Sequence, residues 1–122
     1  MRKNIKTDKL VIAVDFDGTL CEYAFPSIGQ QNESQIKLMN TLKKLKQDGH
    51  KLILWTNRGD NEMYPALTQA IEWCKDRGLE FDSINKNLPE QTKLSGYSPK
   101  IIADMYIDDL AVNVKNWEDF LL

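Results

Sequence analysis

Hydrophobic and polar residues are arranged along the chain as short apolar runs separated by longer amphipathic stretches. The first run, residues 10–14, contains no polar residue, which is typical of a strand buried on both faces of a parallel sheet. Residues 51–56 contain a second such run, residues 81–84 a shorter one, and residues 105–109 a run that ends in two acids. We therefore expect four β-strands at these positions, and a short edge strand at residues 112–114.

The amphipathic stretches predict two main helices. Apolar residues recur about every three positions across residues 33–48, and Gly49 follows as a helix stop. A second helix is expected to begin at Asp60 or Asn61, either of which can cap it, and to end near Arg77. The lysines of the first helix are expected to form a solvated face: Lys37, Lys43, Lys44 and Lys46. Residues 21–32 are predicted to be a loop, residues 85–99 a loop with one turn of helix, and residues 117–122 a final helical turn.

Strands that alternate with helices predict an α/β fold with right-handed crossovers. We expect a three-layer sandwich around a central parallel, Rossmann-like sheet. A chain of 122 residues is long enough for one hydrophobic core. The sequence therefore predicts a single domain that spans residues 1–122.

Composition narrows the classes of function. A net charge of −2 does not provide the excess of positive charge that favours binding to nucleic acid. The chain also lacks an apolar run long enough to span a membrane. Residues 1–9 lack the apolar core of a signal peptide. Cys21 and Cys74 are far apart and form neither a metal-type pair nor a disulfide framework. We expect a cytoplasmic protein, in which the lone His50 at the start of the second strand is structural.

Polar side chains follow three of the predicted strands. Asp15 and Asp17 end the first strand, Thr56 ends the second, and Asp108 with Asp109 ends the fourth. Because parallel strands end at the same edge of a sheet, these side chains are expected to lie together. Carboxylates that gather there repel one another unless a cation binds, and a few hard oxygen ligands suit Mg²⁺, the usual partner of a phosphate. The sequence thus predicts a magnesium site for a phosphorylated ligand.

The segment Asp15-Phe16-Asp17-Gly18-Thr19-Leu20 resembles the first motif of the haloacid dehalogenase (HAD) superfamily of phosphohydrolases. Thr56 at the end of the second strand resembles the second motif, and Asp108-Asp109 resembles the fourth, in the superfamily's order. The resemblance covers most of the chain. It implies a Mg²⁺-dependent phosphatase that cleaves a phosphate monoester through an aspartyl-phosphate intermediate.

The resemblance also implies a role for each residue of the motifs. Asp15 would be the nucleophile, and Asp17 would protonate the leaving group and then activate water. Mg²⁺ would be held by the Asp15 carboxylate, the Asp17 main-chain carbonyl and Asp108, with Asp109 nearby. Thr56 and main-chain amides such as that of Gly18 would hold the phosphoryl oxygens.

The lysine of the third motif is expected between the third and fourth strands. Lys100 is preferred, because the segment from Lys100 to Asp109 is similar to a lysine-to-Asp-Asp segment in small members of the superfamily. Lys86 and Lys93 remain alternatives. Asp104 is interpreted as a turn or cap residue, because four residues of strand span about 13 Å and separate it from Asp108.

The intervals in which HAD proteins carry a cap domain are too short for one here, so the resemblance is to the capless branch. An open site suits either a bulky phosphorylated substrate or a small phosphate ester enclosed by a neighbouring subunit in a homo-oligomer. Asn57 and Arg58 are expected to contact the substrate beyond its phosphate, with a surface-loop position as the alternative for Arg58. Tyr23 and Phe25 either wall the mouth of the site or fix their loop on the core.

Two other classes of protein are compatible with parts of this pattern. A phosphoacceptor domain of the receiver type uses acids, a threonine and a lysine, but in another order along the chain. A catalytically silent module of the same fold would bind a phosphoester or a metal ion without reaction. Release of phosphate from a phosphate ester separates an enzyme from both.

Overall fold

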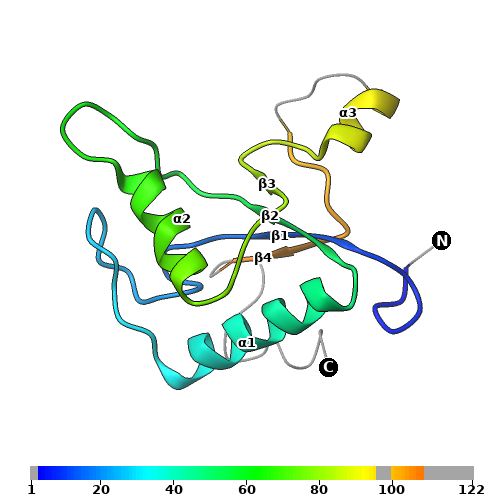
Figure 1. The fold of residues 1–122 in the computed structure, drawn as a ribbon, viewed down its shortest axis with the longest axis horizontal. Helices are drawn as coiled ribbons and strands as arrows, with labels where there is room; N and C mark the ends of the chain where they lie inside the picture. Colours follow the sequence, from blue (N-terminus) through cyan, green and yellow to red (C-terminus); the bar gives the residue numbers. More distant parts are fainter. Residues whose placement is uncertain (1–2, 96–99, 109–122) are drawn as a thin grey trace.

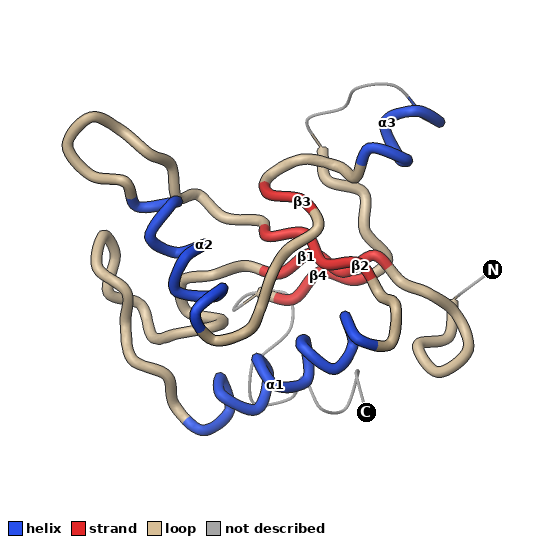
Figure 2. The backbone as a smooth tube through the Cα atoms, in the orientation of Figure 1, coloured by secondary structure: helices blue, strands red, loops and turns tan. Residues whose placement is uncertain are grey.

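A computed structural model describes residues 3–95 and 100–108 of the chain (Figure 1). Its centre is a sheet of four parallel strands in the order β3-β2-β1-β4 (Figure 2). The strands are β1 (Val11–Val14), β2 (Lys51–Leu54), β3 (Ser83–Ile84) and β4 (Met105–Ile107). The expected α/β class and parallel sheet are confirmed. The expected strand at residues 112–114 and helical turn at residues 117–122 lie outside the described residues.

The strand order explains where the helices lie. From β1 through β2 to β3 the chain moves across the sheet in one direction, and right-handed crossovers then place α1 (Glu33–Gln47) and α2 (Ala66–Asp76) on the same face. The connection from β3 to β4 runs back in the other direction and therefore crosses the opposite face. The order reverses between β1 and β4, and this reversal is where open α/β sheets bind ligands.

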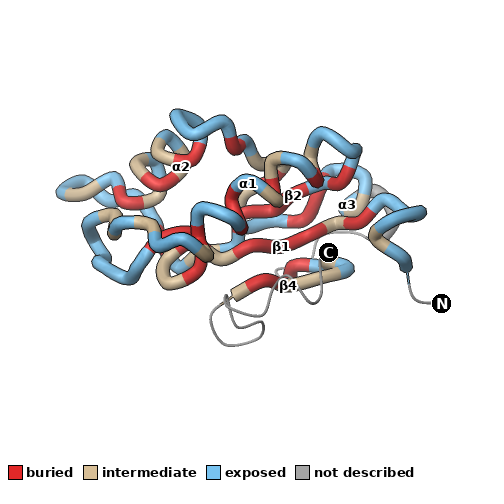
Figure 3. The backbone as a smooth tube through the Cα atoms, turned by 90° about the horizontal axis from the view of Figure 1, so that it is seen from below, coloured by how far each residue is buried: buried red, intermediate tan, exposed pale blue. Residues whose placement is uncertain are grey.

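The main core lies between the sheet and the two helices. Apolar side chains of β1 and β2 pack against apolar residues of α1 and α2. Figure 3 shows buried residues along β1 and β2 and on parts of both helices. Fully buried members of this cluster include Ile12, Val14, Leu38, Leu42, Leu52, Leu54 and Cys74. α1 begins with a capping box, in which the Asn32 side chain accepts from the Gln35 N–H and the Gln35 side chain accepts from the Asn32 N–H. The predicted first helix is confirmed.

The opposite face has a thinner cover. Ala13 and Ile53 pack there against Leu88 and Ile101, which belong to the connection from β3 to β4. This connection contains α3 (Pro89–Ser95), within a segment for which one helical turn was expected. The buried Asn87 holds the connection together, because its side chain donates to the Lys100 carbonyl and accepts from the Ile102 N–H.

Two predictions about helices need correction. α2 begins at Ala66, not at Asp60 or Asn61, and its N-cap residue is Pro65. The Asp60 carboxylate accepts from the Thr68 N–H in the first turn of the helix. The expected solvated face of α1 is wrong in part. The ammonium groups of Lys43 and Lys46 donate to the carbonyls of Arg77 and Glu80 and so tie α1 to the segment after α2.

Within the described ranges, no helix is both long and apolar enough to cross a bilayer.

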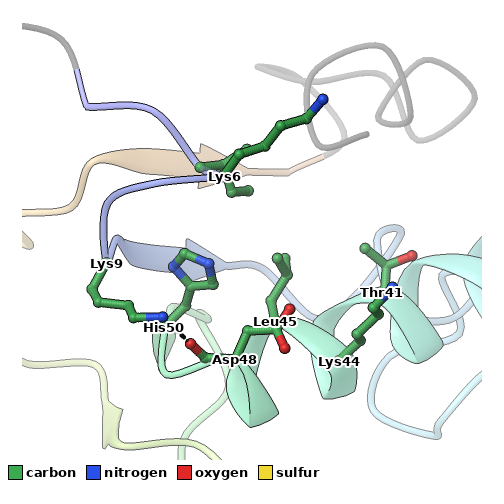
Figure 4. A pocket seen from close by; sticks show the side chains of 8 residues that line it. Lys6, Lys9, Thr41, Lys44, Leu45, Asp48 and His50 are labelled. Carbon is green, nitrogen blue, oxygen red and sulfur yellow. Dashed lines mark hydrogen bonds between the residues drawn. The ribbon is translucent and has the colours of Figure 1, made fainter.

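His50 joins the amino ends of β1 and β2, which confirms its structural role. Its Nδ1 accepts from the Leu10 N–H at 2.9 Å, and the ring is buried. Lys9 and Asp48 lie beside it in a cavity at this edge (Figure 4). Burial lowers the pKa of His50 below its usual value of 6.5, and the charge of Lys9 lowers it further. The folded protein therefore favours the neutral ring.

This pKa shift predicts a pH-dependent loss of stability. Above pH 6.5 the ring is neutral in both folded and unfolded chains. As the pH falls below that value, the unfolded chain binds a proton that the folded chain resists, so the free energy of unfolding decreases until the lowered pKa is passed. Urea denaturation across this range should show the decrease. His50→Asn, which keeps an acceptor and removes the titration, should flatten it, whereas an equal slope in both proteins would contradict this role.

Candidate functional site

The carboxyl ends of the strands bring three of the predicted acids, Asp15, Asp17 and Asp108, to one edge of the sheet. Val14 pairs with Ile107, and the Asp15 N–H donates to the Ile107 carbonyl at 2.9 Å, so Asp15 and Asp108 follow neighbouring positions of β1 and β4. On the other side of β1, the Trp55 N–H donates to the Val14 carbonyl at 2.8 Å, which brings Thr56 to the same edge. Asp104 lies in a bend at the opposite edge, where its carboxylate accepts from the Val11 N–H.

A cavity of about 400 Å³ opens at this edge. Its walls come from the segment after β1, the loop that follows, and the segment after β2. The lining side chains are Asp15, Asp17, Tyr23, Phe25, Thr56, Asn57 and Arg58. The structure thus gathers most of the predicted residues around one space. A second cavity, at the amino edge beside His50, contains none of them (Figure 4).

The turn after β1 fixes the two acids in different surroundings. Asp15 is half-buried, and its Oδ1 accepts from the Phe16 N–H at 2.8 Å. Phe16 is fully buried in the core, and Asp15 and Asp17, which precede and follow it in the sequence, both line the cavity. Gly18 has a φ of 80°, a conformation that favours glycine. Its N–H donates to the Cys21 carbonyl, so in this structure the amide predicted to bind phosphate closes the turn.

Arg58 holds the carboxylate of Asp17. Its Nε donates to Oδ2 at 2.9 Å and its Nη2 donates to Oδ1 at 2.8 Å, which makes a two-bond ion pair. The other three N–H groups of the guanidinium donate to main-chain carbonyls of Pro26, Ser27 and Ala66. All five donors are therefore used by the protein itself.

The position of Arg58 differs from both sequence-based expectations. The residue is 2% exposed, so its placement on a surface loop is wrong. With every donor occupied, it has no N–H left for a substrate in this conformation, and its contacts are those of a positioning residue. The guanidinium also lies 5.0 Å from the centre of the Phe16 ring and 5.1 Å from that of Phe25. Arg58 thus connects Asp17 with the loop that carries Phe25.

Thr56 and Asn57 also line the cavity. The Thr56 hydroxyl oxygen accepts from the main-chain N–H of Arg58 at 3.1 Å, and the main-chain N–H of Thr56 donates to the Asn85 side chain at 2.8 Å. Asn85 was not predicted. It adopts a left-handed conformation with a φ of 54°, which asparagine tolerates better than most residues. Asn57 is exposed, so its amide can meet a ligand.

Two of the three candidate lysines, Lys86 and Lys100, are described by the structure and do not line this cavity. Lys100 and Lys86 are both exposed, and Lys93 lies in α3, where its side chain is not described. The backbone of Lys100 is held by Asn87, whose amide donates to the Lys100 carbonyl at 3.0 Å. The choice among these three lysines stays a prediction.

The donor set at the carboxyl edge fits Mg²⁺ better than a cation that needs many protein ligands. Asp15 and Asp108 directly follow the paired ends of β1 and β4, although Asp108 is not among the residues that line the cavity. Mg²⁺ commonly takes one or two carboxylates and completes its shell with water and phosphate. Among the described residues, no group of three or more His, Cys, Asp or Glu side chains is arranged to hold a metal ion. Asp109 lies outside the described residues.

A cysteine nucleophile does not fit this site, although Cys21 lies close to it in sequence. The thiol is fully buried, and burial raises its pKa to about 11. It therefore stays protonated near neutral pH, and a protonated thiol is a poor nucleophile. The polar side chains that line the cavity are two carboxylates, the hydroxyls of a threonine and a tyrosine, an amide and a guanidinium.

The ion pair between Arg58 and Asp17 should contribute strongly to stability. We expect Arg58→Met to lower the free energy of unfolding by about 3 kcal/mol or more, because it leaves a half-buried carboxylate unpaired. Asp17→Asn in the same background should then cost little. Urea denaturation of the two single variants and the double variant measures the coupling. Losses that add within about 0.5 kcal/mol would show that the two side chains act independently.

Comparisons with known proteins identify a relative and assign no activity. No protein-family model matches the chain, and no curated protein matches it. A solved structure of a conserved protein from Bacteroides thetaiotaomicron is 40% identical in sequence and superposes with a TM-score of 0.72. The similarity covers 93% of this chain and 93% of the Bacteroides chain. The chain described here therefore belongs to the same family as this conserved Bacteroides protein.

Proposed function

We propose that this protein is a Mg²⁺-dependent phosphatase that cleaves a phosphate monoester through an aspartyl-phosphate on Asp15. The observation that supports the proposal most is the cavity at the carboxyl edge, because Asp15, Asp17 and Thr56 all line it. These residues match the order of the HAD motifs, and the reversal of strand order beside β1 is where α/β sheets bind ligands.

Asp15 is suited to the role of nucleophile. Its Oδ1 is fixed by the Phe16 N–H, which orients the carboxylate at the end of β1. Attack of a carboxylate oxygen on phosphorus forms the acyl phosphate while the bond from phosphorus to the ester oxygen breaks. Attack of water on the same phosphorus then releases inorganic phosphate and restores the carboxylate.

Asp17 is suited to proton transfer in both steps. It would donate a proton to the departing ester oxygen and later accept one from the attacking water. Arg58 occupies both carboxylate oxygens, but each oxygen keeps a second lone pair that can carry a proton. The two bonds fix the plane of the carboxylate, so we assign Arg58 the role of positioning residue for Asp17.

The rest of the cavity would hold the phosphoryl group. The main-chain N–H of Arg58 orients the hydroxyl of Thr56, which would donate to a phosphoryl oxygen. Asn57 lines the same cavity. A lysine, preferably Lys100, would supply positive charge. Asp15, Asp108 and the Asp17 carbonyl would hold Mg²⁺, with Asp109 nearby, and the bound ion would neutralise charge on the phosphoryl oxygens.

The surroundings of the site fit an intracellular enzyme with an open active site. Cys21 and Cys74 are both free and buried, which agrees with a reducing cytoplasm. The loop between β1 and α1 is too short for a cap domain, so a bulky substrate can approach or a second subunit can cover the cavity. The alternative function is a catalytically silent module that binds a phosphoester or metal ion.

The proposal predicts phosphate release that depends on Asp15 and Mg²⁺. Wild-type protein with Mg²⁺ should release phosphate from members of a panel of aryl, alkyl and sugar phosphates. Asp15→Asn should lower kcat by at least about 1,000-fold, because the nucleophile is lost. Asp17→Asn should lower it by about 100- to 10,000-fold. EDTA should abolish release, and added Mg²⁺ should restore it.

Two controls separate chemistry from folding. Both variants should keep the wild-type far-ultraviolet circular dichroism, and Asp104→Asn, which changes an acid at the opposite edge of the sheet, should keep the wild-type kcat. If the wild-type protein binds inorganic phosphate with Mg²⁺ but cleaves no ester of the panel, the phosphatase proposal fails and the silent binding module remains.

A further inference from the structure

The loop between β1 and α1 presents two aromatic rings at the candidate site. Tyr23 is 73% exposed and Phe25 is 47% exposed, and both line the cavity that contains Asp15 and Asp17. Large apolar rings are usually covered in a folded protein, because water contact with them is unfavourable. Two such rings in the same cavity as two carboxylates therefore indicate a surface that a ligand covers.

The loop that carries these rings is closed at its base. The Glu22 N–H donates to the Gln30 carbonyl at 2.8 Å, and the Gln31 side chain donates to the Leu20 carbonyl at 2.9 Å. Gly29 fits against Glu22 so closely that a Cβ added to it would lie 1.9 Å from the Glu22 carbonyl oxygen. The two ends of the loop are thus held side by side.

Arg58 holds the outer part of the same loop. It donates to the carbonyls of Pro26 and Ser27, and its guanidinium lies 5.1 Å from the centre of the Phe25 ring. The group that holds Phe25 is the group that holds Asp17. The position of the ring relative to the acid is therefore set by the protein before a ligand binds, which lowers the ordering cost of binding.

We infer that the cavity takes phosphate monoesters whose leaving group carries a planar aromatic ring. The phosphate would lie toward Asp15 and Thr56, and the ring of the leaving group would lie against Tyr23 and Phe25. A volume of about 400 Å³ suits a small ligand, such as a phosphate with one ring. The inference rests on the proposed phosphatase function and adds the substrate class and the residues that select it.

A preference for a planar ring follows from how aromatic rings pack. Edge-to-face or offset contacts between aromatic rings increase affinity by about 2- to 10-fold beyond the area that they bury. A saturated ring of the same size buries a similar area and lacks that contribution. Binding that depends on area alone would therefore not distinguish the two rings, whereas the subsite proposed here would.

Two matched pairs of ligands test this inference. Benzylphosphonate and cyclohexylmethylphosphonate cannot be hydrolysed, and calorimetry with Mg²⁺ compares their Kd values. Benzyl phosphate and cyclohexylmethyl phosphate have leaving alcohols of similar reactivity, so their kcat/KM values can be compared directly. We expect the aromatic member of each pair to be favoured by about 3- to 10-fold, with the kinetic difference in KM.

Variants of Tyr23 test whether the preference for aromatic ligands depends on this side chain. Tyr23→Leu should reduce the preference to less than about 2-fold, and Tyr23→Phe, which keeps the ring, should retain it. Inorganic phosphate should bind both variants as it binds wild type, because its contacts lie at the other end of the cavity.

The outcomes separate this inference from the proposed function. Equal binding and equal cleavage of the aromatic and saturated members would overturn the aromatic subsite and leave the phosphatase standing. Preference for benzylphosphonate without cleavage of either ester would support the subsite and overturn the phosphatase. A preference that survives in Tyr23→Leu would also overturn the role given to Tyr23.

Discussion

The buried guanidinium of Arg58 is the interaction on which the candidate site depends. A charged group that is removed from water must find partners for all its donors, and Arg58 finds them in Asp17 after β1, in the loop at Pro26 and Ser27, and in Ala66 at the start of α2. Arg58 itself follows β2. One side chain therefore joins four segments that meet at the carboxyl edge of the sheet.

The strand order decides which acids share that edge. β1 lies between β2 and β4, so the segment that contains Asp15 is flanked by Thr56 on one side and by Asp108 on the other. The crossovers to β2 and β3 cover one face, and the return to β4 covers the other. Open α/β sheets bind ligands at such a reversal, and the cavity found here lies beside it, between the segments that follow β1 and β2.

The sequence predicted the elements that depend on local pattern. The apolar runs of β1 and β2 and the periodicity of α1 are strong signals, and parallel pairing then places Asp15, Asp17 and Thr56 together. It failed where distant contacts decide the outcome. No local pattern could show that Arg58 is buried, since its partners are mostly main-chain carbonyls far away in sequence. The start of α2 was missed because Asp60 binds the Thr68 N–H across a loop of several residues.

The central claim is that Asp15 becomes phosphorylated during turnover, and the most direct test is to measure the mass of the chain while it turns over substrate. Wild-type protein mixed with a reactive aryl phosphate and Mg²⁺, quenched in acid within milliseconds and digested, is analysed by mass spectrometry. Our account predicts one added phosphoryl group on the peptide that contains Asp15, lost on treatment with hydroxylamine and absent in Asp15→Asn. Phosphate release without any phosphorylated peptide, or a phosphoryl group on another residue, would contradict it.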